Sequence, residues 1–565
     1  MTAARILLTI EVEDYFHVGR FDDFIPRDRW YRFEGRIEHN TRRALDLVEA
    51  SGARATFFVL GWVAERFPEL VREIAARGHE VASLGYDHRT MEEMGPPELR
   101  ADVVRAREAL ERATGLRVLG HRVPHYLGPY DMWALDLLAE EGFAYDSSVK
   151  PLFRRFAREP WRRVAHEHIS PGGRSIWEFP LSAAHFGLSI PIAGAGYFRH
   201  FPPSLVSRAI RRWLAQHDAP FVMYFRVWEL DPEQPQIQTA PLHERVRHYR
   251  NLDKMAARLA YYLERYPVGG IASHLGLLDE QGRPPVAAPS ASPTPPVRTA
   301  GSASPGGDEP RTPVTVVVPC FNEEASLVYL SNTLTSVRAQ LGARYELRFL
   351  FVDDASSDST ASLLERHFGA VPGCRVLRHD TNRGVAAAIL TGIRAAETDV
   401  VCSMDCDCTY DPHELGRMIP LLVDGVDMVT ASPYHPQGGV RNVPGWRLGL
   451  SRGASWLYRA VLPQALYTFT SCFRVYRRSA VADMELDEGG FLGVAEMLAR
   501  LLLAGGSVVE YPTVLEVRLL GLSKMKAARG VIGHLGLLRR MLALRIRRRL
   551  LGPPGAKSAT AGLAP

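Results

Sequence analysis

The sequence reads VTVVVPCFNEE from position 314 to 324, so an apolar β-type run ends in an amide and two carboxylates. The run LFVDDASSDST follows the same plan through Asp353 and Asp354, and VVCSMDCD ends in Asp405 and Asp407. Helical patterns separate these runs, which predicts an open, doubly wound α/β sheet over the second half of the chain. Because the carboxyl ends of parallel strands face the ligand crevice of such sheets, we expect these carboxylates to form a site.

An Asp-x-Asp pair after a strand places two hard oxygen ligands on one side of a pocket, which suits Mg²⁺ or Mn²⁺ bridging a diphosphate. Such a pair is common on protein surfaces and is weak evidence when it stands alone. Here the pair Asp405 and Asp407 follows, in order, the two carboxylate-ending runs and the segment Asn382-Arg-Gly384. That order makes a metal and diphosphate site the preferred interpretation.

This order of motifs resembles family 2 glycosyltransferases of the GT-A fold, in the branch of dolichyl- or polyprenyl-phosphate sugar synthases, from about residue 312 to 526. Later segments support the branch: ASPY at 431–434, TSCFR at 470–474, GF at 490–491 and GLSKM at 521–525. The resemblance implies a nucleotide-sugar donor, held by Pro319, Asn322, Glu324, Asp353, Asp354, Asn382 and Gly384. It also implies that Asp405 and Asp407 bind Mg²⁺ or Mn²⁺, and that Arg474 and Lys524 contact the donor or acceptor phosphates.

Two positions depart from this branch. Thr409 stands where the branch usually has Gln, and Pro433 stands where it often has Arg, which leaves the donor and some phosphate contacts open. The acceptor then decides the chemistry: a phosphate monoester, with a second pKa of about 6, is already anionic at pH 7 and needs little help from a base. A sugar hydroxyl would need a base, for which Glu496 is the candidate, the alternative being a structural carboxylate on a helix face.

The first half of the chain also alternates β-rich runs with helical patterns. We expect strands at Arg5–Ile10, Ala55–Leu60, Glu80–Ser83, Leu116–His121, Ser175–Phe179, Pro220–Phe225 and Gly269–His274. So many βα units predict a parallel sheet closed, or nearly closed, into a barrel. Pro, Ser, Ala and Gly then dominate, which predicts a flexible linker. We therefore expect a (β/α) barrel at 1–281, the linker at 282–312, the GT-A domain at 313–526, a basic helix at 527–551 and a disordered tail at 552–565.

Six segments of the first half resemble the polysaccharide deacetylase family (carbohydrate esterase family 4), in its exopolysaccharide-associated branch. They are EVEDYF at 11–16, ATFFVLGW at 55–62, GHEVASLGYDH at 78–88, GHRVP at 120–124, DSS at 146–148 and WELDP at 228–232. The resemblance implies metal-assisted hydrolysis. An Asp acts as base, a carboxylate and two His hold the metal, and a late-strand His protonates the leaving amine.

This chain departs from that family at the positions that carry the chemistry. Glu11 stands at the base position, Leu84 at the first metal His, and Arg226 at the late-strand His. Leu has no lone pair for a metal, and Arg stays protonated in proteins, so it cannot exchange the proton of the catalytic cycle. We therefore expect an inactive deacetylase domain.

One ligand His, His88, remains beside Arg122 and one carboxylate, Asp14 or Glu13. Catalytic metals normally have three protein ligands and an open position, so we expect the deacetylase-site metal to be weakly held or absent. The competing hypothesis is a rewired metal site in which His125 replaces the lost ligand. Four aromatic residues fit two interpretations, a sugar-binding groove or core packing: Trp228, Tyr86, Tyr126 and Tyr197.

Composition limits the class of protein. A chain of 565 residues exceeds one core, and 46% hydrophobic with 23% charged residues excludes a wholly disordered chain. The net charge of +5 is too small to argue for nucleic acid. The six cysteines lie in the second half without zinc-finger spacing, which fits a reducing compartment. We see no run of about 18 apolar residues, so we expect a cytoplasmic protein, peripheral at the inner face of the cytoplasmic membrane if it binds lipid.

The segment from 527 to 551 carries Arg539, Arg540, Arg545, Arg547 and further arginines, and no acidic residue follows Lys524. Apolar residues recur at helical spacing, which predicts a basic amphipathic helix. Such a helix either lies on an anionic membrane surface or docks on the transferase with its charges in water. Nucleic-acid binding is a weaker third interpretation, because no recognition motif accompanies the charge.

The leading hypothesis is a metal-dependent transferase that moves a sugar from a nucleotide-sugar to a polyprenyl phosphate or a surface polysaccharide. The first domain would then bind glycan or act as a scaffold. One alternative is a bifunctional deacetylase and glycosyltransferase, and another is a non-catalytic assembly protein.

Overall fold

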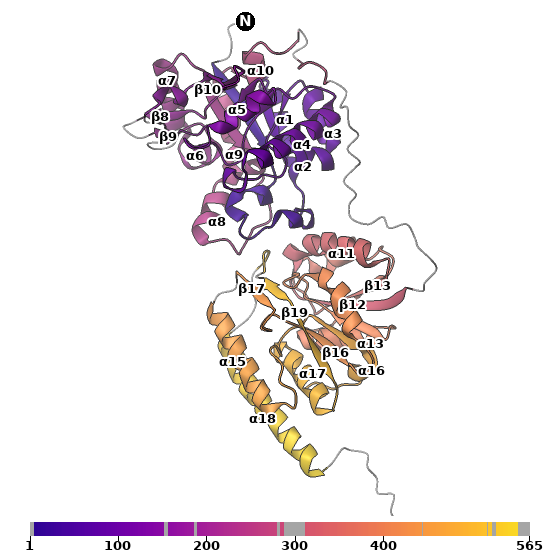
Figure 1. Ribbon diagram of the computed structural model, residues 1–565. Helices are drawn as coiled ribbons and strands as arrows, with labels where there is room; N and C mark the ends of the chain where they lie inside the picture. Colours follow the sequence, from indigo (N-terminus) through magenta and orange to yellow (C-terminus); the bar gives the residue numbers. More distant parts are fainter. Residues whose placement is uncertain are drawn as a thin grey trace, which may run out of the picture. The chain divides into compact units, whose positions relative to one another are not determined.

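The computed structural model describes residues 5–151, 156, 158–185, 189–279, 283–287, 311–442, 445–516, 518–521 and 527–551. The chain forms two compact units (Figure 1). The first comprises Met1–Trp30, Gly35–Gln234 and Ala240–Pro295; the second comprises Tyr31–Glu34, Pro235–Thr239 and Pro296–Pro565. Each unit has its own sheet and hydrophobic core.

The sheet of the first unit has the strand order β10-β1-β2-β3-β4-β5-β7-β6, with β11 also paired to β1. All the pairs are parallel except β6 with β7. The order is that of a (β/α) barrel, which stays open between β10 and β6 in the part of the chain that the structure describes. The strands are β1 (Ile6–Val12), β2 (Thr56–Val59), β3 (Glu80–Ser83), β4 (Gly120–His121), β5 (Tyr145–Asp146), β6 (His166–Ile169), β7 (Ser175–Glu178), β10 (Phe221–Arg226) and β11 (Val268–Gly269).

Strand β1 is buried along its whole length, as expected of a central parallel strand covered on both faces. Its register against β10 places Glu11 beside Arg226, and its register against β2 places Glu11 beside Phe58. The covering helices are α1 (Ile37–Ala50), α2 (Gly61–Arg66), α3 (Pro68–Ala76), α4 (Pro96–Thr114), α5 (Trp133–Glu140), α6 (Ala195–His200), α7 (Pro203–Gln216), α8 (Leu242–Tyr249) and α9 (Met255–Arg265). A hairpin, β8 (Ala183–His185) and β9 (Ser189–Pro191), completes the unit.

The prediction of a last barrel strand at Gly269–His274 is wrong. Residues 269–274 form the end of the short strand β11 and then the helix α10 (Ile271–His274). The first N–H groups of α10 find side-chain acceptors in the sheet: Ile271 N donates to Thr56 Oγ1 at 2.8 Å and Ala272 N donates to Glu80 Oε2 at 3.0 Å. These buried acceptors bind N–H groups that would otherwise lack partners at the start of the helix. They come from distant strands, so the local apolar pattern could not predict the helix.

Residues 283–287 belong to the first unit and form backbone hydrogen bonds with it. Arg117 N donates to Pro285 O at 2.8 Å and Ala287 N donates to Gly115 O at 3.1 Å. This part of the segment expected to be a linker therefore pairs with the residues that follow α4.

The sheet of the second unit has the order β14-β13-β12-β15-β18-β16-β19. It is parallel except for β18, which is antiparallel to both neighbours. The strands are β12 (Thr312–Cys320), β13 (Tyr345–Asp353), β14 (Cys374–Arg378), β15 (Val400–Ser403), β16 (Met428–Ser432), β18 (Arg474–Arg477) and β19 (Val508–Pro512). Two short strands, β17 (Gly439–Arg441) and β20 (Val514–Glu516), pair separately. The chain adds β13 and β14 on one side of β12 and then places β15 on the other side. Open α/β sheets form their ligand crevice at such a change in strand order.

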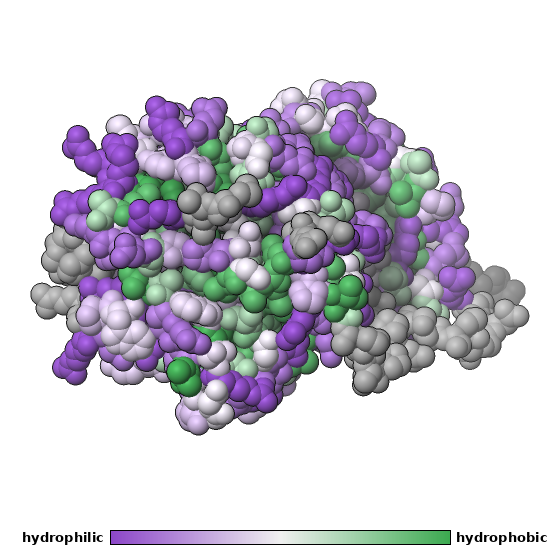
Figure 2. All heavy atoms as spheres, turned by 90° about the horizontal axis from the view of Figure 1, so that it is seen from above, coloured by the Kyte–Doolittle hydropathy of each residue, from purple (hydrophilic) through white to green (hydrophobic). Residues whose placement is uncertain are grey.

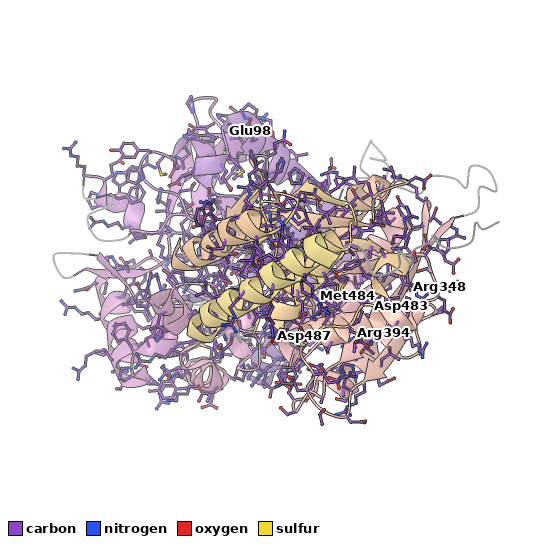
Figure 3. The ribbon with its side chains drawn as sticks, turned by 90° about the horizontal axis from the view of Figure 1, so that it is seen from below. Glu98, Arg348, Arg394, Asp483, Met484 and Asp487 are labelled. Atoms are coloured by element: carbon purple, nitrogen blue, oxygen red, sulfur yellow. The ribbon has the colours of Figure 1, made fainter. Side chains whose placement is uncertain are left out.

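The longer helices of this unit are α11 (Leu327–Leu341), α12 (Thr360–Phe368), α13 (Val385–Ala395) and α17 (Phe491–Leu503), with two short ones, α14 (Leu415–Met418) and α16 (Arg478–Val481). Figure 3 labels Arg394, on α13, and Met484, beyond α16; Arg394 Nη2 donates to Met484 O at 2.9 Å. The six cysteines of the chain are all free thiols.

Two helices, α15 (Gly445–Val461) and α18 (Ala527–Leu551), lie side by side (Figures 1 and 3). Tyr458 Oη of α15 lies 2.9 Å from His534 Nδ1 of α18. Leu537, Leu538 and Met541 of α18 are buried in the core of the second unit. This helix is therefore docked along one face.

Among the described residues, none of the helices has the length and apolar character needed to span a bilayer. Figure 2 shows hydrophobic residues near the middle of one face of the molecule and hydrophilic side chains around them. A mixture of this kind is ordinary, since apolar atoms contribute much of the surface of any folded protein.

Candidate functional site

The second unit gathers carboxylates at the carboxyl ends of β12, β13 and β15. Strand β15 lies next to β12, and Met404 N donates to Val317 O at 3.1 Å, so the residues after β15 follow the edge of the sheet. Asp405 comes next and is enclosed among buried neighbours, and Asp407 accepts the N–H of Thr409 at 3.1 Å. The local fold therefore holds the two carboxylates close together.

The charged form of Asp405 is disfavoured in this site. Burial and the nearby charge of Asp407 raise the pKa of Asp405 to about 7. A divalent ion would relieve both effects, so the donor set fits Mg²⁺ or Mn²⁺. The described residues contain no group of three or more potential metal-ligating side chains, so a divalent ion here would have Asp405 and Asp407 as its carboxylate ligands.

Arg518 also belongs to this site, although the sequence patterns did not single it out. Its guanidinium donates to Asp407 Oδ2 at 2.7 Å and to the carboxylate of Glu323. Burial alone would lower the pKa of Arg518, but the charges of Asp407 and Glu323 outweigh it and raise that pKa well above its ordinary value. The available signal was its place: Arg518 is the basic residue three positions before Gly521 of the GLSKM segment.

Asp354 organises the loop that carries Asn382 and Gly384. Its two carboxylate oxygens accept the N–H groups of Arg383 at 2.8 Å and Gly384 at 2.7 Å, and His379 Nδ1 lies 2.7 Å away. Gly384 has φ +93°, and a Cβ there would lie 2.5 Å from Gly489 O. The loop therefore requires glycine at this point.

The neighbouring Asp353 is fully buried. It accepts the N–H of Ser356 at 3.1 Å and forms an ion pair with Arg378 Nε at 3.2 Å. Asn382 Nδ2 donates weakly to Asp354 O, at 3.4 Å. Both residues thus shape the backbone at the edge of the sheet.

Asn322 and Glu324 also bind backbone in this structure. Asn322 Oδ1 accepts the N–H of Ser357 at 2.7 Å, and Glu324 Oε2 accepts the N–H of Ser359 at 3.1 Å. Pro319 lies on β12, opposite Val352 of β13. These residues join the loop after β12 to the loop after β13, next to the carboxylates described above.

The residues expected to act on phosphates or protons have defined environments. Arg474 is fully buried and donates to Val494 O and Phe469 O, both at 2.8 Å. Glu496 is fully buried and accepts the N–H groups of Asp487 at 3.1 Å and Glu488 at 2.9 Å, and Arg500 Nε at 2.6 Å. Lys524 lies outside the described residues.

In the first unit, the ends of β1 and β10 form a compact charge network. Arg226 Nε lies 2.8 Å from Glu11 Oε2 and 2.7 Å from Glu13 Oε1. Arg122, also buried, donates to Glu11 Oε1 at 3.2 Å and to Ser147 Oγ at 2.8 Å. A guanidinium from the chain itself thus lies between the two carboxylates.

Glu13, rather than Asp14, faces His88. His88 Nε2 lies 2.8 Å from Glu13 Oε2, and Trp228 Nε1 donates to Glu13 Oε1 at 3.1 Å. Burial would raise the pKa of Glu13, but Arg226, His88 and the Trp228 hydrogen bond together lower it well below its ordinary range. Asp14 instead accepts the N–H groups of Tyr15 at 2.9 Å and Arg36 at 2.7 Å, and burial raises its pKa to about 7.

Leu84 is fully buried within the hydrophobic core, so this position contributes packing. His125 stacks edge-on against His88 with ring centroids 5.0 Å apart, and its Nε2 lies 3.8 Å from Asp22 Oδ2. Burial and the neighbouring His88 lower the pKa of His125 to about 4. The described residues therefore hold His88, His125 and Glu13 near one another without a metal-binding cluster of three.

A cavity of about 440 Å³ opens beside this network. Three of the four aromatic residues considered from the sequence line it: Tyr126, Tyr197 and Trp228. Tyr86 does not; its hydroxyl donates to Glu65, and Arg105 lies over its ring.

Family models match both halves of the chain. The model described as "Polysaccharide deacetylase" matches residues 21–145, "Domain of unknown function (DUF3473)" matches 147–274, and "Glycosyl transferase family 2" matches 315–484.

Curated proteins match the second half. Polyprenol monophosphomannose synthase of Mycolicibacterium smegmatis is 32% identical over 221 residues, covering 38% of this chain and 81% of the relative. Undecaprenyl-phosphate mannosyltransferase of Micrococcus luteus is 31% identical over 227 residues, covering 39% of this chain and 90% of the relative. A solved mannosyltransferase from Pyrobaculum calidifontis, in complex with GDP-Man and Mn²⁺, aligns at 18% identity with a TM-score of 0.31, covering 42% of this chain and 65% of that one. A structural similarity this low assigns no role to any residue of this chain.

Proposed function

Because this chain belongs to glycosyltransferase family 2, we propose that it transfers a sugar from a nucleotide-sugar to a polyprenyl phosphate. The observation that carries the proposal is the carboxylate pair Asp405 and Asp407, held at the end of β15 with Arg518 bound to Asp407. Two relatives that this chain matches over most of their length are named for mannosylation of a polyprenyl phosphate. These names support a lipid phosphate as acceptor. A growing surface polysaccharide is the second candidate acceptor.

The chemistry asks little of a protein base. A phosphate oxygen of the acceptor attacks the anomeric carbon, the bond from that carbon to the diphosphate breaks, and the nucleoside diphosphate leaves. Since the acceptor is already anionic at pH 7, the main task is to bring two anions together. A divalent ion held by Asp405 and Asp407 would supply charge neutralisation for the leaving diphosphate.

We assign the remaining residues according to the groups they touch. Asp354 holds the loop of Asn382 and Gly384 in place for the nucleotide, and Asn322 and Glu324 brace the neighbouring loop. Glu496 supports the Asp487–Glu488 backbone as a positioning residue, since its oxygens are occupied by two N–H groups and Arg500. Arg474 braces α17 through Val494 O, and Lys524 is assigned to the phosphates by resemblance alone.

The helix pair α15 and α18 supplies a surface for an anionic membrane at its cytoplasmic face. Trp456 is 68% exposed, and Leu535, Leu542 and Ile546 of α18 are also exposed. The two helices carry arginines but no acidic residue. Apolar side chains among cations favour the interface of an anionic leaflet, to which each nearby Arg adds about 1 kcal/mol. Such a surface would bring the enzyme to a lipid acceptor.

We propose that the first unit binds glycan without hydrolysing it. The supporting observation is Arg226, whose guanidinium lies between Glu11 and Glu13, so that the carboxylates that could hold a metal are already neutralised. An active, bifunctional deacetylase is the competing candidate. It predicts acetate release from N-acetylated oligosaccharides that is lost in a His88→Ala variant.

The deciding experiment is a transfer assay with the full chain, Mn²⁺ or Mg²⁺, a panel of UDP- and GDP-sugars, and a short polyprenyl phosphate. A variant carrying Asp405→Ala and Asp407→Ala is run in parallel. Lipid-linked product that is lost in the variant supports the proposal and identifies the donor. Donor hydrolysis without lipid product points to a glycan acceptor, and the absence of both turnover and donor binding overturns the proposal in favour of a scaffold.

A further inference from the structure

The cavity of the first unit lies at the carboxyl ends of its strands, the end at which (β/α) barrels bind their ligands. Its lining includes Glu13, His88 and Arg226, whose side chains are largely buried. Its volume of about 440 Å³ is in the range of sites that bind small molecules. The question is which ligand chemistry this particular lining favours.

The buried charges of the lining are paired with one another within the protein. Arg226 neutralises Glu13 and Glu11, as described above. Arg199 donates to Glu229 at 2.7 Å and to His248 O at 2.6 Å. The groups deepest in the cavity therefore leave no carboxylate that needs a metal or a cationic ligand.

The lining as a whole has an excess of positive charge. Five cationic side chains line the cavity, against three carboxylates: Arg20, Lys150, Arg199, Arg226 and Arg247, and Glu13, Glu229 and Glu244. In the described part of the chain, no Asp or Glu forms an ion pair with Lys150 or Arg247. Two cations thus face the cavity without a carboxylate partner.

The surroundings of Arg20 also contain more positive than negative charge. Its guanidinium is 3.6 Å from Glu244, a long ion pair, and its Nε and Nη1 are buried without a hydrogen-bond partner among the described residues. Burial and the nearby charges of Arg226 and Arg247 lower the pKa of Arg20 to about 10. His125 and His200 also line the cavity, and burial lowers the pKa of each. A histidine is neutral or positive, so neither of them offsets the excess of positive charge.

Aromatic faces accompany these cations. Tyr197 and Phe201 stack with ring centroids 6.0 Å apart and an angle of 5°, and Phe201 is 41% exposed. Tyr126 lies under the ammonium group of Lys150, which is 4.2 Å from its ring centroid. Such faces offer apolar area with polar edges, which suits a sugar ring. Trp228 is used differently, since it is buried and stacked on His248.

We propose that this cavity binds a sugar unit that carries a negative charge, a uronate or a sugar phosphate. Arg20, Lys150 and Arg247 would receive the anionic group, and Tyr197 and Phe201 would contact the ring. The inference rests on the proposal that the first unit binds glycan without hydrolysing it. It goes further by naming the charge of the ligand and the residues that select it.

The test is isothermal titration calorimetry on the full chain, without added metal or nucleotide-sugar. Three acidic probes are used: a tetrasaccharide of alternating glucuronate and N-acetylglucosamine, a galacturonate tetramer, and mannose 6-phosphate. The control ligand is the first tetrasaccharide with its carboxylates reduced to alcohols, which keeps the sugar rings and removes the negative charge. We expect at least one acidic probe to bind, and the carboxylate or phosphate to account for about a tenfold gain over the matching neutral sugar.

Variants locate the site. The double variant Lys150→Gln/Arg247→Gln should lower the affinity for the acidic probe about tenfold and leave that for the neutral one unchanged. Arg211→Gln, an exposed cation on α7 that does not line the cavity, should leave both unchanged. Thermal unfolding of each variant tests whether the fold is intact, which is expected because Lys150 and Arg247 form no ion pair with the described residues.

Two results would overturn the inference: no binding of any acidic probe, or equal binding of an acidic probe and its neutral form. Acetate release from an N-acetylglucosamine oligomer is measured in parallel. If acetate is released, the non-hydrolytic role fails, while calorimetry still reports whether the cavity prefers a negative charge.

Discussion

At the scale of single residues, an arginine stands beside carboxylates in each unit. Arg226 pairs with Glu11 and Glu13 at the end of β10, and Arg518 pairs with Glu323 and Asp407 at the edge of the second sheet. The two positions differ in burial of the carboxylates they neutralise: Glu11 and Glu13 are both about 1% exposed, whereas Asp407 is partly open. We infer that Arg226 is a permanent structural cation, because removing it would take away the one guanidinium that Glu11 and Glu13 share, and Arg122 reaches only Glu11 among the two.

Replacing Arg226 should destabilise the first unit. In Arg226→Met, Glu11 and Glu13 keep their burial but lose their shared cation, so we expect the free energy of unfolding at pH 7 to fall by about 3–5 kcal/mol. Urea denaturation followed by fluorescence measures this. The conservative Arg226→Lys should lose less, and a loss below about 1 kcal/mol in Arg226→Met would show that the network is not stabilising.

The same variant should change the pH dependence. The pKa of Glu13 is lowered in the folded state, so its contribution to stability is present above its ordinary value of 4.5 and is lost as the pH falls below it. In Arg226→Met the pKa of Glu13 rises, and this acid-induced loss should shrink. Parallel urea titrations at pH 3.5 and pH 6 compare the two proteins.

Asp405 should make metal binding depend on pH. Its pKa is raised to about 7, so below that pH a proton competes with a metal ion. We expect Mn²⁺ affinity to rise about tenfold from pH 6 to pH 8, as measured by electron paramagnetic resonance titration. Without metal, the second unit should lose stability as the pH rises from 4 to 7, because the folded state holds a proton that the unfolded chain has released.

The matched variants are Asp405→Asn and Asp424→Asn, the latter at an exposed carboxylate away from the site. The first should bind Mn²⁺ weakly at every pH, and the second should behave as the parent protein. An affinity that stays constant from pH 6 to pH 8 in the parent chain would contradict the assignment.

At the scale of elements, the start of α13 illustrates how a loop is tied to a sheet. The N–H groups of Arg383 and Gly384 are bound by Asp354, which comes from the end of a different strand, β13. Gly384 then enters the helix with a positive φ, against the backbone of Gly489. The loop therefore depends on a carboxylate, a glycine and a close backbone contact together.

Substituting Gly384 tests this arrangement. Gly384→Ala should destabilise the second unit by about 1–3 kcal/mol and reduce transfer activity, because Ala combines a positive φ with a Cβ clash. Gly425→Ala is the control: it has φ +81° with nothing within 4 Å of the added Cβ, so it carries the backbone cost alone. Equal losses in the two variants would mean that the contact with Gly489 has no effect.

Helix α18 is docked on the second unit along one face, and membrane contact by another face stays a prediction. Leu537, Leu538 and Met541 bury one face in the core of the second unit, and Leu535, Leu542 and Ile546 remain exposed on another. Removing the helix would therefore expose core residues as well as remove the exposed apolar ones. Single exposed residues give a cleaner test.

Trp456→Gln/Leu542→Gln should weaken binding to anionic vesicles without changing stability. Both side chains are exposed, so little packing is lost, while apolar area available to the interface decreases. Flotation with phosphatidylglycerol vesicles measures the bound fraction. Val423→Gln, at an exposed apolar residue elsewhere in the unit, should bind as the parent does, and equal flotation of all three proteins would contradict a membrane role for this helix pair.

At the scale of the whole molecule, the two units have separate hydrophobic clusters. One cluster includes Leu8, Phe57 and Val222 of the first sheet; the other includes Val317, Leu498 and Met541 of the second unit. A chain with separate cores is expected to unfold in more than one step.

Differential scanning calorimetry should therefore show two transitions. Arg226→Met should lower the midpoint of one, and Gly384→Ala should lower the midpoint of the other. One transition that both variants lower together would show that the units unfold cooperatively.

The sequence by itself determined the architecture of both units, and it predicted which carboxylates form the transferase site. Apolar runs that end in Asp353, Asp354, Asp405 and Asp407 predict parallel strands and their active edge, because strand periodicity and turn chemistry are local properties of a chain. The departures from the deacetylase pattern at Glu11, Leu84 and Arg226 were also readable, since they concern which chemical groups are present.

The tertiary structure decided which partners those groups have. It placed Glu13 rather than Asp14 against His88, brought Arg518 to Asp407, enclosed Glu496 among backbone N–H groups, and turned residues 271–274 into a helix. Each of these depends on contacts between residues far apart in the chain, or on which way a side chain points from a turn. Local sequence patterns carry no information on such contacts, because burial and hydrogen-bond partners are set by packing of the complete fold.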